Sequence, residues 1–69
     1  MPTFVDVKRW ILEAAREMGA NVSTRRAKGL AGDYLTALER DPGLRYSVLT
    51  YDDPTGEQAV RHWFQSVPA

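Results

Sequence analysis

The chain of 69 residues has no cysteine, a single histidine and no excess of charge of either sign, since nine basic side chains balance nine acidic ones. Without cysteine it has no disulfide framework, no thiolate zinc site and no sulfur nucleophile. Its apolar stretches are too short to span a bilayer. The first six residues lack the basic start and apolar core of a secretory signal. We therefore expect a cytoplasmic protein that does not bind membranes.

The length also argues against an enzyme. A chain of 69 residues forms one domain, here expected to be compact over residues 1–69. Its apolar fraction of 43% and charged fraction of 26% are typical of a folded domain rather than a disordered tail. Such a small domain leaves little room for a deep cleft built from several loops.

The neutral total hides an asymmetry along the chain. Residues 1–31 carry six basic and three acidic side chains, and residues 32–69 carry three basic and six acidic ones. A dipolar molecule of this kind can orient on a polyanion although its net charge is zero. A surface that is charged only for solubility would show the same pattern.

The first half of the sequence predicts helices. Thr3 can cap a first helix, Asp6 suits its opening turn, and Gly19 can end it. Its apolar face recurs at helical spacing and consists of Phe4, Val7, Ile11, Ala14 or Ala15, and Met18, with Trp10 beside them.

Ser23 or Thr24 can cap a second helical region, which Asp41-Pro42-Gly43 ends. Its inward face comprises Ala27, Leu30 or Ala31, Tyr34 and Leu38. Gly29 and Gly32 interrupt it. In the alternative that we favour, the two glycines allow close packing on the first helix, and residues 24–40 form one continuous but irregular helical element. In the other, the chain breaks near Gly32 and a third helix follows.

The second half predicts a β-hairpin. Residues 44–51 are rich in aromatic and β-branched side chains, Asp53-Pro54-Thr55-Gly56 is a turn signal, and a second strand would run from about Gln58 to Ser66. The predicted fold class is α+β, with two or three helices before a C-terminal hairpin in a winged-helix-like order. A C-terminal helix is the alternative, because Thr55 and Gln58 can form a capping box and Val60, Trp63 and Phe64 have helical spacing.

Residues for catalysis are scarce. We interpret His62, within an aromatic stretch, as a partly buried structural residue. Asp52, Asp53 and Glu57 surround a turn, but their spacing fits no calcium loop. No glycine-rich phosphate loop follows a strand. We expect no catalytic residue, no metal ligand, no cofactor and no small-molecule substrate.

One segment favours binding to DNA. Ser23, Thr24, Arg25, Arg26 and Lys28 place cations and hydroxyls at the start of a predicted helix, where free backbone N–H groups also attract anions. Lys8 and Arg9 would support them from the first helix. The order of helix, short basic turn and helix loosely resembles SAP-type domains and the C-terminal domains of small nucleoid-associated proteins. The matching residues are Trp10, Ala15, Gly19, Val22-Ser23 and Arg25-Arg26, in about half of the chain. The nucleoid-protein loop carries arginine–glycine–arginine, which this chain lacks, and the predicted hairpin departs from both families.

The sequence also supports a rival from another class, a protein–protein module such as an adaptor or an inhibitor from a mobile element. Its surface would be the apolar hairpin face beside the acidic turn, made of Leu49, Tyr51, Trp63, Asp52 and Asp53. Our leading interpretation is a small DNA-binding or regulatory protein, and a homodimer without other ligands, or a purely structural fragment, is a further alternative.

Overall fold

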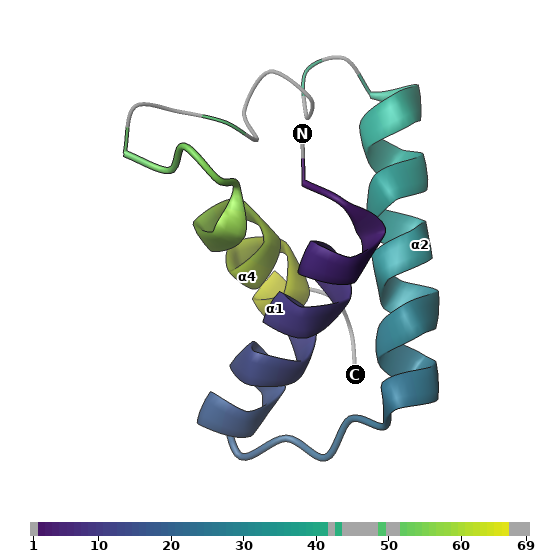
Figure 1. The fold of residues 1–69 in the computed structure, drawn as a ribbon, viewed down its shortest axis with the longest axis vertical. Coiled ribbons are helices and arrows are strands. Elements are labelled where there is room, and N and C mark those ends of the chain that lie inside the picture. Colours follow the sequence, from purple (N-terminus) through teal and green to yellow (C-terminus); the bar gives the residue numbers. More distant parts are fainter. Residues whose placement is uncertain (1, 42, 44–48, 50–51, 67–69) are drawn as a thin grey trace.

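The computed structural model describes residues 2–41, 43, 49 and 52–66, which form three helices and no strand. These are α1 (Phe4–Glu17), α2 (Thr24–Arg40) and α4 (Glu57–Ser66). Figure 1 shows α1 and α2 side by side and antiparallel, with α4 packed across α1, and Trp63 of α4 also reaches Tyr34 of α2. The described part of the chain is therefore all-α, and the predicted α+β fold is wrong.

Helix α1 begins and ends as its sequence predicts. The Thr3 Oγ1 accepts a hydrogen bond from the Asp6 backbone N–H at 3.2 Å. At the other end Gly19 has a φ of +71°, while its N–H donates to the Arg16 carbonyl and the Ala20 N–H donates to the Ala15 carbonyl. This pair of bonds is a Schellman motif, which satisfies carbonyls that the helix leaves open.

Helix α2 is continuous through both of its glycines. Ser23 is its cap, because the Ser23 Oγ accepts from the Arg26 N–H at 3.1 Å. The expected single element over 24–40 is confirmed, but the reason we gave for the glycines is wrong. A Cβ built on Gly29 or Gly32 would meet no atom within 4 Å, so neither glycine permits a close approach to α1.

The C-terminal helix replaces the predicted second strand. The Asp53 carboxylate accepts from the backbone N–H groups of Gln58 and Ala59 at 3.2 and 2.8 Å, which caps the start of α4. The turn at 53–56 is real, with Gly56 at a φ of +85°, but it leads into a helix and not into a hairpin. Thr55 accepts from the Glu57 N–H, so the capping box with Gln58 does not form.

Helical spacing explains why α4 forms. Spacing of three and four residues turns Val60, Trp63 and Phe64 toward the other helices, whereas strand alternation would separate Trp63 from Phe64. The predicted first strand over 44–51 lies outside the described residues, apart from Leu49.

The core lies between the three helices, with α1 in contact with both of the others. The predicted inward face of α2 is confirmed in full, while Phe4 and Met18 at the ends of α1 are exposed. The central cluster comprises Val7, Trp10, Ile11, Ala27, Leu30, Ala31, Tyr34, Leu38 and Val60, with Leu12, Val22, Leu35, Trp63 and Phe64 packed against it.

Candidate nucleic-acid interface

The segment predicted to contact phosphates occupies the first turns of α2. Arg25, Arg26 and Lys28 are all exposed, and so are Ser23 and Thr24. The Ser23 Oγ already accepts from Arg26, but its hydroxyl hydrogen remains able to donate to a ligand. No group in the described residues accepts from the backbone N–H of Thr24 or Arg25. The start of α2 therefore presents donors and cations together.

Arg16 joins this segment from the preceding helix. It lies in the last turn of α1, which residues 18–23 connect directly to the first turn of α2 (Figure 1). Its side chain is exposed, and within the described ranges neither it nor Arg25, Arg26 or Lys28 pairs with a carboxylate. We call these four residues the basic end. Arg16 was not among the residues predicted to contact phosphates, because nine positions of the chain separate it from Arg25 and the two residues belong to different helices.

Lys8 and Arg9 do not lie at the start of α2. They belong to the first half of α1, and the helical rise places Lys8 about 12 Å from Arg16 along the axis. The Arg9 Nη2 pairs with the Asp6 Oδ1 at 3.3 Å, and its guanidinium lies 6.0 Å from the centroid of the Trp10 ring. Lys8 has no carboxylate partner among the described residues. Support of the 23–28 segment by Lys8 and Arg9, from the first helix, stays a prediction.

A cluster of ion pairs around Arg61 gathers carboxylates on the side of α1 that faces α4. The Arg61 Nε lies 3.1 Å from the Glu57 Oε2, Nη2 lies 3.3 Å from the Glu13 Oε2, and Nη1 bonds to Glu17. Burial by itself would lower the pKa of Arg61, but its hydrogen bonds to Glu57 and Glu17 raise the pKa overall. The Arg61 cluster holds three carboxylates against one guanidinium and so keeps a formal charge of −2.

The hairpin on which the rival interpretation places its surface does not form over 58–66, and the residues of that surface lie in different settings. Trp63 is half-buried and meets the Tyr34 ring edge to face, with 5.0 Å between ring centroids and 62° between ring planes. Asp53 caps α4 and is not an open acidic turn. Asp52 and Leu49 are exposed, and Tyr51 lies outside the described residues. Trp63 therefore serves the core.

Two further titratable groups, His62 and Tyr34, lie in different settings. His62 is exposed, so its interpretation as a partly buried residue is wrong. Tyr34 is 1% exposed, and its hydroxyl has no hydrogen-bond partner in the described part of the chain. Burial raises the pKa of Tyr34, and the negative charge of Asp53 raises it further. Neither group faces a partner suited to proton transfer within the described residues.

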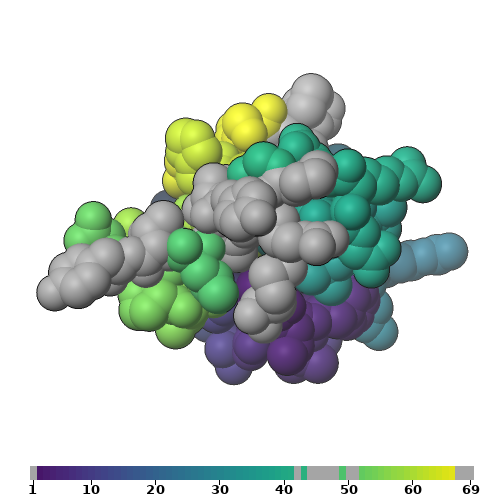
Figure 2. All heavy atoms as spheres, turned by 90° about the horizontal axis from the view of Figure 1, so that it is seen from above, coloured from purple at the N-terminus to yellow at the C-terminus, as the bar shows by residue number. Residues whose placement is uncertain are grey.

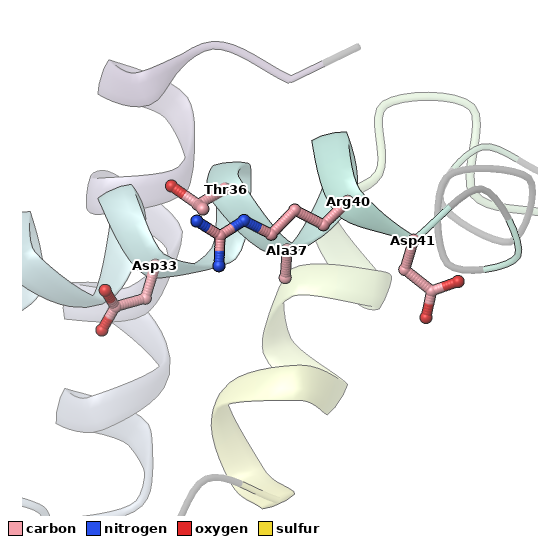
Figure 3. A pocket seen from close by; sticks show the side chains of 5 residues that line it. All are labelled: Asp33, Thr36, Ala37, Arg40 and Asp41. Carbon is pink, nitrogen blue, oxygen red and sulfur yellow. The ribbon is translucent and has the colours of Figure 1, made fainter.

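A shallow depression on α2 has mixed charge. It is lined by Asp33, Thr36, Ala37, Arg40 and Asp41. Figure 3 shows the Arg40 side chain lying back along the helix toward Thr36 and Asp33. Aspartates at both ends of the depression disfavour a phosphate there, because carboxylates repel anions.

The described residues hold no metal-binding cluster and no membrane-spanning helix. Within residues 2–41, 43, 49 and 52–66, no group of three or more histidine, cysteine, aspartate or glutamate side chains could hold a metal ion. None of the helices described here is both long and apolar enough to cross a bilayer. No protein-family model matches the chain, and no curated protein or solved structure is significantly similar to it.

Proposed function

We propose that the chain is a small, non-enzymatic DNA-binding protein with a regulatory role, and that it contacts backbone phosphates through the basic end. The observation that carries this proposal is the separation of charge in the fold. Arg16, Arg25, Arg26 and Lys28 have no carboxylate partner among the described residues, while Arg61 pairs with Glu13 and Glu17 of α1 and with Glu57 of its own helix.

The chemistry of the first turn of α2 suits a phosphate. The open N–H groups of Thr24 and Arg25 and the positive end of the helix dipole attract an anion, and the Ser23 hydroxyl can add a short hydrogen bond. Arginine adds paired donors in a planar fork that matches two phosphate oxygens. Such contacts position a protein on a duplex without reading its sequence. We therefore expect binding that is strong in low salt and tolerant of sequence.

The test is a fluorescence-anisotropy titration of labelled random duplex DNA at about 50 and 200 mM salt, where counterion release is readily measured. Each phosphate contact should add about 0.9 to the slope of log affinity against log salt. The variant Arg25→Ala/Arg26→Ala should lower that slope by about 1.8. Alanine is the best helix former, so α2 should stay intact.

A matched control separates the basic end from net charge alone. The variant Arg40→Glu changes the net charge by the same amount as Arg25→Ala/Arg26→Ala, but it lies about 22 Å away along α2 from Arg25. It should leave the salt slope unchanged. Absence of binding by the wild-type protein at concentrations on the order of 100 µM, the weak end of non-specific affinity, would refute the proposal. Equal losses in the two variants would refute the assignment to the basic end.

A further inference from the structure

The outer face of α1 carries a groove that the proposed function does not use. The groove lies on the side of the helix away from its buried residues, and α1 forms one edge of the molecule in the view of Figure 2. Its lining residues in the described part of the chain are Val5, Lys8, Arg9, Leu12, Glu13 and Arg16. They combine apolar and basic side chains, and all of them come from one helix.

The charge that this groove offers is positive. Lys8 and Arg16 have no carboxylate partner among the described residues. Glu13 is turned to Arg61, and Arg9 is bound to Asp6. The groove is therefore lined by three cations and one acid, and Lys8 and Arg16 are the two cations that pair with no carboxylate of the described residues.

The spacing of those cations fits a duplex. Lys8, Leu12 and Arg16 recur at four-residue steps, so they follow one stripe of the helix. The rise of the helix separates Lys8 from Arg16 by about 12 Å, which is about the width of the major groove of B-form DNA. Leu12 lies between them and is half-buried, with Val5 beyond at 61% exposure. Apolar side chains at such positions can meet thymine methyl groups.

We infer that α1 is a second DNA-contacting element, which crosses the major groove with Lys8 and Arg16 on phosphates of opposite strands. This inference rests on the proposed function. Arg16 belongs to both surfaces, so the contact continues from the first turn of α2 along α1 to Lys8. The occupant is duplex DNA and not duplex RNA, because the major groove of A-form RNA is too narrow for protein side chains to enter.

The test compares paired variants in the same titration. Lys8→Ala alone should lower the salt slope by about 0.9, Lys8→Ala/Arg16→Ala by about 1.8, and the latter combined with Arg25→Ala/Arg26→Ala by about 3.6. Arg40→Glu is again the control for net charge. Far-UV circular dichroism checks that each variant is helical, and Lys8→Gln/Arg16→Gln repeats the measurement with side chains that keep polarity.

Competition identifies the partner. Unlabelled B-form duplex should displace the labelled duplex at least tenfold better than single-stranded DNA or duplex RNA of equal phosphate content. Equal competition would overturn the role of the groove. If the wild-type protein binds and Lys8→Ala keeps the full salt slope, the inference on α1 fails while the proposed function stands, because Lys8 is not part of the basic end. If the wild-type protein does not bind, both fail.

Discussion

The two glycines inside α2 give the sharpest test of the packing. Gly29 and Gly32 lie within a continuous helix, and a Cβ added at either position would meet no atom within 4 Å. Neither has a positive φ. Glycine in a helix interior costs about 1 kcal/mol of stability relative to alanine, because the glycine backbone has more conformational freedom in the unfolded chain and loses more of it on folding. Gly29→Ala and Gly32→Ala should therefore each raise the free energy of unfolding by about 1 kcal/mol.

The two gains should add, since alanine methyl groups in open space share no partner. In a domain of this size, a change of 1 kcal/mol corresponds to about 4–8 °C in Tm. The measurement is urea and thermal unfolding followed by far-UV circular dichroism.

Gly19→Ala is the opposite control for these measurements. Gly19 also has open space around it, but its φ is +71°. Alanine there should cost about 1–2 kcal/mol, because its Cβ clashes in the left-handed conformation. Destabilisation by Gly29→Ala or Gly32→Ala would refute the reasoning, since it would mean that something packs against that side of α2.

Two further perturbations address the buried tyrosine and the Arg61 cluster. Tyr34→Phe should leave stability at neutral pH unchanged or raise it by about 1 kcal/mol, because it removes a buried hydroxyl without a partner among the described residues. The folded state raises the pKa of Tyr34, so the wild-type protein should lose stability relative to Tyr34→Phe as the pH rises above about 10, where the unfolded chain ionises first. Parallel pH profiles in urea unfolding would contradict this explanation. Arg61→Met should cost about 1 kcal/mol at low salt, a modest loss because the glutamates are 41–67% exposed, and the difference should shrink at about 1 M NaCl. A difference that is independent of salt would indicate lost packing instead of lost charge pairing.

The sequence predicted the helices whose determinants are local. Thr3, Gly19 and Ser23 act within one turn of the residues that they cap, so the bounds of α1 and α2 could be predicted. The C-terminal segment could not be assigned in this way, because the turn at 53–56 is compatible with both a hairpin and a helix. The choice depends on the Asp53 carboxylate reaching the first turn of α4, and on apolar contacts with α1.

The part of the candidate site that is local in the sequence could likewise be predicted, and the part that depends on contacts between helices could not. The exposed cations at the start of α2 follow from neighbouring residues in the sequence. Arg16 and the pairing of Arg61 with Glu13 and Glu17 do not, because they depend on how the helices are placed in space.

Helix α1 contacts α2, which is close to it in the sequence, and α4, which is far from it. This difference affects the order of folding. The short connection over 18–23 makes α1 meet α2 at a small cost in loop entropy. Arg61 meets Glu17 and Glu13 only across 44 and 48 positions of the chain. Because contacts between near neighbours form earlier than distant ones, we expect the α1–α2 hairpin to form first and α4 to dock last. The basic end would then be assembled before the carboxylates of α1 are drawn to Arg61.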